Sequence, residues 1–526
     1  MPDLIFRILF TVLAAAVLTV MSAKMFQMLQ LSSYRTRGVF AWFRATKFDY
    51  VARYFACAFL SGAAMAMYLA CFSAFLWAFY LGAAAFFLFG ILFVVISRKS
   101  ELQKTPLKLT KRLRRLAVVT ALLNLGLVFG LLALGIPLST DFGDFHAANY
   151  AFAALAFFLI PLTVCLAHLI LLPVEKLIQG RYKAKTKKRL EANPSLIKIG
   201  ITGSYGKTTA KNILCAMLSK KYRVLATPAS YNTPMGICKA VGESLAADTE
   251  VFIAEMGARY RGDIAELCDL VRPQYGLITG IGSQHLETFG DEETLYKTKH
   301  ELVDSLPKTG CAFFNGENEG ANRMFAEYGG AKRLSVANEA IGSQAQSASV
   351  FCLPPSVLSP LLGKHIPGLI ALCASVALEL GVSMEQIMAA AAELKPVPHR
   401  LEPVVRGETT IIDDAYNANL DGAINALEVL GGYKDTRIVV TPGLVELGAA
   451  EERANRDFGK AIAKYADYAV LNSLRGAWIK AGALEGGMNE ERIFLVADLA
   501  AATAKLGEIP GKKTILFEND LPDNLK

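Results

Sequence analysis

The first third of the chain is almost continuously apolar, whereas the rest alternates short apolar runs with polar segments. Residues 54–97 contain no Asp, Glu, Lys, Arg or His. A helix that crosses a membrane needs about 20 apolar residues, so this run predicts two helices joined by a tight turn. Three more apolar stretches, at 4–23, 116–136 and 150–173, predict further spans. The pattern therefore predicts an α-helical transmembrane domain of five helices over residues 1–178, of which a cleavable signal peptide explains only the first.

Beyond residue 195 the pattern of apolar and polar residues is typical of an α/β protein. Apolar runs of strand length, such as "IKIGIT", "VFIAEM", "CAFFN" and "RIVVT", alternate with helical patterns. This alternation predicts parallel sheets. A basic linker at 179–195 and a second boundary near His399 and Arg400 divide the chain. We expect a central domain at 196–400 and a Rossmann-like C-terminal domain at 401–526.

The charges of the loops predict an orientation in the membrane. Residues 24–53 carry six basic side chains against one acid, residues 98–115 eight against one, and residues 175–190 seven against one. The loop at 137–149 has two acids and no Lys or Arg. Because positive loops stay in the cytosol, the N-terminus is expected outside and the α/β domains in the cytosol. The protein is thus predicted to be a multi-pass protein of the cell membrane in contact with membrane lipids.

The net charge of +8 follows from these loops, so nucleic acid is not an expected partner. The nine cysteines include no CxxC pair, which argues against a disulfide framework or a zinc ribbon.

The stretch "IKIGITGSYGKTTAKNIL" reads as a strand, a glycine-containing turn and a helix. Such a turn lets backbone N–H groups approach a phosphate at the N-terminus of the helix. Lys207 is expected to neutralise the β- and γ-phosphates, and the Thr208 hydroxyl to take Mg²⁺. The predicted phosphate loop comprises Gly203, Ser204, Tyr205, Gly206, Lys207, Thr208 and Thr209. Ile201 stands where the usual motif has its first glycine.

The spacing TGxxGKTT resembles that of Mur ligases, the ATP-dependent amide ligases of peptidoglycan assembly. The resemblance extends over the whole α/β part and is closest to the UDP-N-acetylmuramoyl-tripeptide–D-alanyl-D-alanine ligase branch. It implies a central ATP-binding domain and a C-terminal ligase domain. Here the membrane helices stand in the place of the UDP-sugar-binding domain of soluble relatives.

An acid at the end of an apolar strand lies well for a ligand crevice, and Glu255 has that position in "VFIAEMG". The resemblance implies that Glu255 and Thr208 hold one Mg²⁺. It also implies that His285 and Lys299, fourteen residues apart, support a second Mg²⁺, with Lys299 carbamylated. A carbamate offers Mg²⁺ an oxygen anion, which an ammonium cannot. The predicted catalytic residues are Lys207, Glu255, His285 and Lys299.

The resemblance assigns four further residues to the nucleotide. They are Asn315, Arg400, and Asp414 and Asn417 of "IIDDAYNANL". It also places Gly443 and Glu446 of "VTPGLVELG" at the pocket for the amine substrate.

Three departures concern the parts that choose the substrate. Ile366 and Leu369 stand where asparagines are expected near adenine, and Leu420 replaces a proline. The late Lys-Gly-Ser-Arg element is absent, and the chain ends in "LFENDLPDNLK".

The sequence thus predicts a membrane-anchored ligase that uses ATP and two Mg²⁺ ions. It would join the carboxylate of a cell-envelope precursor, lipid-linked in our interpretation, to the amine of an amino acid or peptide through an acyl phosphate. Two related alternatives are addition of D-alanyl-D-alanine to a soluble UDP-linked tripeptide and a reaction like that of polyglutamate synthases. Two alternatives from other classes are a non-catalytic membrane scaffold and an ATP-driven transporter, although no LSGGQ-like signature is present.

Overall fold

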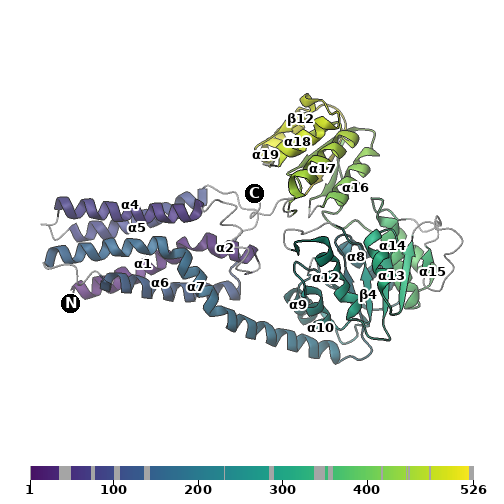
Figure 1. The fold of residues 1–526 in the computed structure, drawn as a ribbon, viewed down its shortest axis with the longest axis horizontal. Coiled ribbons are helices and arrows are strands. Elements are labelled where there is room, and N and C mark those ends of the chain that lie inside the picture. Colours follow the sequence, from purple (N-terminus) through teal and green to yellow (C-terminus); the bar gives the residue numbers. More distant parts are fainter. Residues whose placement is uncertain are drawn as a thin grey trace. The chain divides into compact units, whose positions relative to one another are not determined.

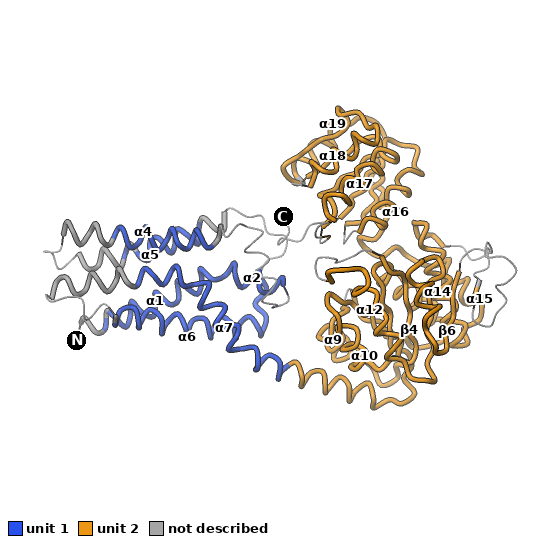
Figure 2. Tube along the Cα trace, viewed as in Figure 1, with its two compact units in different colours: residues 1–178, 522–526 blue, residues 179–521 orange. Residues whose placement is uncertain are grey.

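The chain forms two compact units, residues 1–178 with 522–526, and residues 179–521 (Figure 2). The computed structural model describes residues 2–32, 34, 49–72, 78–99, 107–134, 142–229, 231–282, 289–336, 350–352, 359–415, 419–445, 447, 450–472 and 475–519.

The first unit consists of predominantly apolar helices that lie side by side, and the last of them, α7, continues into the second unit (Figure 1). They are α1 (Pro2–Met21), α2 (Ala23–Leu31), α4 (Asp49–Phe72), α5 (Ala78–Lys99), α6 (Lys111–Leu134) and α7 (Phe142–Glu191). Aromatic side chains fill their common core: the ring of Phe86 stacks on Phe157 with centroids 4.4 Å apart and meets Phe10 edge-on at 5.4 Å. Helices are therefore present at all five positions where the apolar pattern predicts them.

Three helical segments among the described residues are long and apolar enough to cross a membrane: Arg7–Leu31, Lys111–Ala133 and Ala153–Glu191. The described apolar parts of α4 and α5, Val51–Ala64 and Phe86–Val95, are shorter. Five membrane crossings therefore remain a prediction.

The basic segment predicted as a linker is helical up to Glu191, because α7 continues through it. Within the second unit this end of α7 packs on the central domain. Lys183 and Lys187 pair with Glu266 and Asp269 of α10 (Asp263–Val271).

The second unit contains two α/β sheets, as the alternating pattern predicts. The central sheet has seven parallel strands in the order β2-β3-β1-β4-β5-β6-β7. The strands are β1 (Ile197–Thr202), β2 (Val224–Ala226), β3 (Val251–Glu255), β4 (Tyr275–Ile278), β5 (Cys311–Asn315), β6 (Lys332–Val336) and β7 (Val350–Cys352).

Helices cover both faces of this sheet because its strands are apolar on both sides. Ile201 and Phe313 pack on one face against α8 (Lys207–Leu218), α14 (Ile366–Glu379) and α15 (Met384–Ala392). Phe252 and Phe314 pack on the other face, against α9 (Pro234–Ser244), α10, α12 (Glu292–Asp304) and α13 (Glu319–Glu327). Because the strands are parallel and packed on both faces, their carboxyl ends lie along one edge of the sheet.

The C-terminal sheet has six strands in the order β12-β11-β10-β13-β9-β8. All neighbours are parallel except β8 and β9. The strands are β8 (Glu402–Arg406), β9 (Thr409–Asp414), β10 (Thr436–Thr441), β11 (Tyr468–Leu471), β12 (Ile493–Leu495) and β13 (Lys513–Glu518). The helices are α16 (Leu420–Gly431), α17 (Glu451–Tyr465), α18 (Gly476–Glu485) and α19 (Leu499–Glu508), with a short 3₁₀ turn, η3 (Glu490–Arg492).

Candidate active site

The phosphate loop joins β1 to α8 at the carboxyl edge of the central sheet. β1 lies between β3 and β4, and Ile201 is the register partner of Glu255 at the end of β3. Gly206 caps α8 with a φ of +75°, in the left-handed region that glycine tolerates best. Gly203 has no room for a side chain, because a Cβ would come within 2.1 Å of the Thr279 hydroxyl. The turn therefore presents backbone at the start of a helix, as an anion site requires.

Lys207, the first residue of α8, folds back over this loop. Its Nζ donates to the carbonyl oxygens of Gly203, at 2.6 Å, and Ser204, at 3.1 Å. Burial lowers the pKa of Lys207 to about 8, and the Glu255 carboxylate opposes that shift. Most of the lysine population is thus still cationic at neutral pH and can compensate phosphate charge.

Glu255 is the centre of a buried polar cluster. The whole residue is 1% exposed, and the Thr208 hydroxyl donates to its Oε2 at 3.1 Å. Asn232 donates to the other oxygen, Oε1, at 3.3 Å. The predicted pair of Mg²⁺ ligands, Thr208 and Glu255, is thus together beside the phosphate loop.

Lys211 is a member of this cluster that sequence reasoning missed. Its Nζ lies 3.0 Å from Glu255 Oε2, and both side chains are 2% exposed. Removing one partner of such a buried pair leaves an uncompensated charge, which is strongly destabilising. The only sign of this contact in the sequence is the spacing of the two lysines. Lys211 follows Lys207 by one helical turn and so faces the same sheet edge.

Lys299 lies on α12 and is 3% exposed. Its Nζ is 6.0 Å from the centroid of the Phe289 ring. Burial, followed by the positive charge of Lys207, lowers the pKa of Lys299 to about 7. A large fraction of this amine is therefore uncharged near neutral pH, which is the form that reacts with CO₂ to give a carbamate. His285, the other predicted support of a second metal ion, lies outside the described residues.

These residues fit Mg²⁺ in part. Thr208 and Glu255 bring two hard oxygens to the same point next to the phosphate loop, which suits a Mg²⁺ ion shared with phosphate oxygens. No group of three or more His, Cys, Asp or Glu that could hold a metal occurs among the described residues. The second ion, predicted from His285 and a carbamylated Lys299, stays a prediction, because His285 lies outside the described residues.

Other loop residues are fixed by the neighbouring strand ends. Asn318, the N-cap of α13, donates to the Tyr205 hydroxyl at 2.7 Å, and the Ser204 hydroxyl accepts from the Gly282 N–H at 3.1 Å. Thr209 follows Thr208 in the first turn of α8. Asn318 is a second contact that the sequence analysis did not include.

The residues predicted to contact the base and ribose are more dispersed. Asn315 is 3% exposed at the end of β5, and its Nδ2 donates to the Thr279 carbonyl at 2.8 Å. Leu369, in the place of an expected asparagine, packs against Gly206 and extends the apolar contact of α14 with the loop. Asn315 thus links the ends of two neighbouring strands by this hydrogen bond. The contact between Asn315 and adenine stays a prediction.

Asp414 ends β9 in the C-terminal domain. Its Oδ1 accepts from the Leu401 N–H at 3.3 Å, and burial raises its pKa to about 6 against the opposing charge of Arg400. Arg400 and Asp414 are therefore close enough to influence each other. Asn417 and Glu446 lie outside the described residues.

Comparison with known proteins gives two family matches. Residues 201–351 match the Mur ligase middle domain, and residues 399–517 match the Mur ligase glutamate ligase domain.

Curated relatives of the chain are UDP-N-acetylmuramoyl-tripeptide–D-alanyl-D-alanine ligases. That of Escherichia coli K12 is 30% identical over 277 residues, which cover 50% of this chain and 61% of the relative. That of Mycobacterium tuberculosis H37Rv is 34% identical over 253 residues, 44% of this chain and 48% of the relative. The chain thus spans about half to three fifths of the length of these relatives.

Solved structures show the same fold. MurF from Acinetobacter baumannii superposes with a TM-score of 0.58 at 22% identity, covering 65% of this chain and 77% of that one. MurF ligase from Thermotoga maritima in complex with ADP gives 0.56 at 22% identity, covering 66% and 82%.

Proposed function

Because the chain belongs to the Mur ligase family, we propose that it is an ATP-dependent ligase that joins a carboxylate to an amine. The observation that carries this proposal is the buried contact of Thr208 with Glu255 beside a phosphate loop. A reaction through an acyl phosphate requires that the nucleotide and a metal ion bind next to each other. It requires no nucleophilic side chain of the protein.

The residues of the site would have separate roles, set by their charge. The N–H groups at the start of α8 and the Lys207 ammonium would bind the β- and γ-phosphates. Thr208 and Glu255 would hold Mg²⁺, which neutralises the phosphoryl group in transfer. The substrate carboxylate attacks the γ-phosphorus, and ADP leaves. The amine then attacks the acyl carbon, loses a proton, and inorganic phosphate leaves as the amide forms.

Lys211 and Asn232 would hold Glu255 in one orientation during both steps of the reaction. Their contacts with its two oxygens leave the carboxylate with little rotational freedom. A ligand held in this way loses little entropy when a metal binds.

We further propose that the first unit spans a membrane. Large apolar side chains are exposed around its helices, including Leu88, Leu122, Phe129 and Leu162, each at least 61% exposed. Large exposed apolar side chains of this kind are unfavourable in water and suit a lipid environment.

The topology is testable by labelling. The basic loops predict that residue 141 faces outward and residue 180 the cytosol. With a membrane-impermeant maleimide on intact cells, Asp141→Cys should react and Gly180→Cys should react only after lysis. Wild-type protein measures the background from the native cysteines. The opposite pattern of labelling would reject this orientation.

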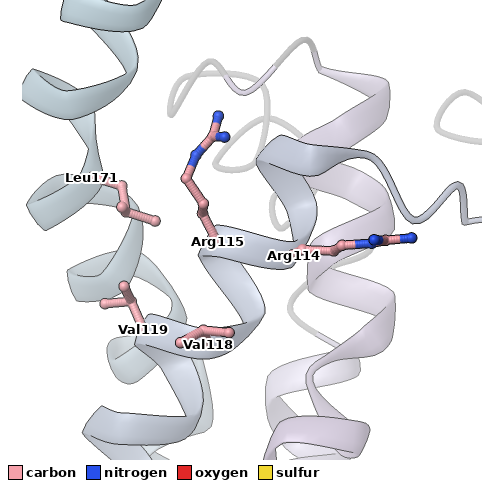
Figure 3. A pocket seen from close by; sticks show the side chains of 5 residues that line it. All are labelled: Arg114, Arg115, Val118, Val119 and Leu171. Carbon is pink, nitrogen blue, oxygen red and sulfur yellow. The ribbon is translucent and has the colours of Figure 1, made fainter.

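The carboxylate substrate is, in our proposal, linked to a lipid. A lipid tail confines the substrate to the bilayer, which raises its effective concentration at a membrane-anchored enzyme. A shallow apolar groove of about 300 Å³ lies between α6 and α7 (Figure 3). Val118, Val119 and Leu171 line it together with Arg114 and Arg115, and the Arg115 guanidinium pairs with Glu175 at 2.6 Å.

A second candidate substrate is the soluble UDP-linked tripeptide of the relatives' names. A protein that begins at residue 179 distinguishes the two, because it keeps the contact of Arg189 with the Gly242 carbonyl and loses the membrane helices. Lipid-linked precursor should be used at least about tenfold more efficiently by the full chain, in line with the gain from tethering. Equal use of a soluble UDP-linked precursor by both proteins would refute the lipid proposal.

A further inference from the structure

A cluster of charged side chains lies in the otherwise apolar first unit, where α6 begins. Glu175 of α7 is 5% exposed and accepts a hydrogen bond from Arg115 Nε at 2.7 Å, while Arg112 Nε lies 3.6 Å from its other oxygen. The Arg112 guanidinium also lies over the ring of Tyr34, 4.0 Å from the ring centroid. Because guanidinium groups stay charged in proteins, two cations here share one carboxylate. The described members of the cluster thus carry an excess of one positive charge.

Two buried polar atoms of this cluster have no hydrogen-bond partner in the described part of the chain. They are the hydroxyl oxygen of Tyr34 and Nε2 of His168. His168 is 4% exposed on α7, interacts electrostatically with Arg112 and Glu175, and contacts the backbone of Tyr34. Buried polar atoms without a partner are costly, and ionisable residues between membrane helices usually belong to functional sites. These two groups therefore point to a polar ligand.

The apolar groove between α6 and α7 adjoins this cluster. Arg115 belongs to both, because it lines the groove and pairs with Glu175 (Figure 3). Leu171, on the wall that α7 forms, lies one helical turn from both His168 and Glu175. A ligand with its apolar tail in the groove would therefore have its polar end at the cluster.

We propose that this cluster binds the phosphate group of an anionic lipid. A phosphate accepts hydrogen bonds from the Tyr34 hydroxyl and from an N–H at His168 Nε2, and its negative charge offsets the excess of the two arginines. Arg112 and Arg115 lie in the first two turns of α6, where the helix dipole also favours an anion. An uncharged headgroup would leave the guanidinium excess uncompensated. The site goes beyond the proposed ligase reaction and rests on the proposal that the first unit lies in a membrane.

Native mass spectrometry of the full chain in an uncharged detergent tests this site with three probes. Dioctanoyl phosphatidic acid carries tails and a phosphate, dioctanoylglycerol carries only the tails, and inorganic phosphate has no tail. Phosphatidic acid should bind saturably, one molecule per chain, at concentrations where the other two do not bind. Equal binding of dioctanoylglycerol would mean that only the tails are recognised, and equal binding of inorganic phosphate would make the ligand a soluble anion. Either result, or no saturable binding, would overturn the proposal.

Tyr34→Phe removes only the unpartnered hydroxyl, so it should not lower the melting temperature of the lipid-free protein. It should weaken the binding of phosphatidic acid at least about tenfold, the loss expected for a hydrogen bond to a charged group. Tyr182→Phe is the matched control, because Tyr182 is a tyrosine of α7 that is 52% exposed. The control should bind as the wild type does. Unchanged binding by Tyr34→Phe, or an equal loss in Tyr182→Phe, would contradict the site.

Arg112→Gln removes one guanidinium and leaves the pair of Arg115 with Glu175 in place. The cluster is then neutral, so binding of phosphatidic acid should again fall at least about tenfold. Arg181→Gln, which changes an exposed arginine of α7, should have no such effect. Equal affinities for Arg112→Gln and wild type would reject the role of the excess charge and, with it, the phosphate site.

Lipid binding and ligation can fail independently, because lipid binding requires neither ATP nor an amine. Saturable binding of phosphatidic acid by a wild-type protein that ligates nothing would refute the proposed function and support this site. Ligation by a protein that does not bind phosphatidic acid would refute this site alone.

Discussion

Replacing Lys207 by alanine is expected to lower the rate of ATP-dependent ligation by a factor on the order of 10²–10³ or more, as for the loss of a group that stabilises transition-state charge. The Lys207 Nζ lies over the loop, at 2.6 Å from the Gly203 carbonyl, where phosphate oxygens would be bound. Its loss leaves charge on the transferring phosphoryl group uncompensated. Initial rates of ADP release and amide formation measure the effect.

Lys308→Ala is the matched control, because Lys308 is an exposed lysine of the same domain. That variant should keep the wild-type rate. If folded Lys207→Ala retained more than about a tenth of the wild-type rate, a loss far below that of a single charge-stabilising donor, Lys207 would have no role in phosphoryl transfer.

Replacing Lys299 by alanine is expected to remove nearly all activity, and acetate or another short carboxylate should restore part of it. The proposed carbamate would supply oxygen to Mg²⁺, and a small carboxylate can enter the space that the side chain vacates. Lys297→Ala is the matched control, since Lys297 lies two residues away on α12 with its side chain 58% exposed. A normal rate for Lys299→Ala without added carboxylate would exclude this lysine from the mechanism.

The pH dependence of the wild type follows from the same residue. With a pKa of about 7, Lys299 is mostly protonated below pH 7 and mostly neutral above it. Only the neutral amine forms a carbamate, so activity should fall as the pH decreases from 8 to 6. Added bicarbonate should raise the activity of wild type near pH 7 and leave Lys299→Ala unchanged.

The fold could be predicted from sequence because its signals are local. Strands such as β1, β3 and β5 are short apolar runs with turns at both ends, and the phosphate loop needs glycines at fixed spacing. The helices of the first unit likewise follow from uninterrupted apolar length. Gly206 is an example of such a local signal, because its left-handed backbone conformation depends only on the turn in which it lies.

The contacts that could not be predicted depend on residues far apart in the chain. Lys211 meets Glu255 only because α8 packs over the end of β3, across 44 positions of sequence. Glu518 lies beside Asp414 because β13 inserts between β10 and β9 in the sheet order. Neither a charged residue on a helix nor an acid at the end of a strand carries a local sign of such a partner. The helical continuation of α7 through the basic segment was also not foreseen, because that segment contains no apolar periodicity.

The most direct test of the ligase proposal is the dependence of ATP turnover on both substrates. Detergent-purified full chain with ATP and Mg²⁺ is incubated with cell-envelope precursors and amino acids or dipeptides, singly and in pairs, and ADP and amide are quantified together. The account predicts that ADP release requires a carboxylate precursor, and that with its matching amine one amide forms for each ADP. ATP hydrolysis at the same rate with and without every precursor, and without any amide, would contradict it.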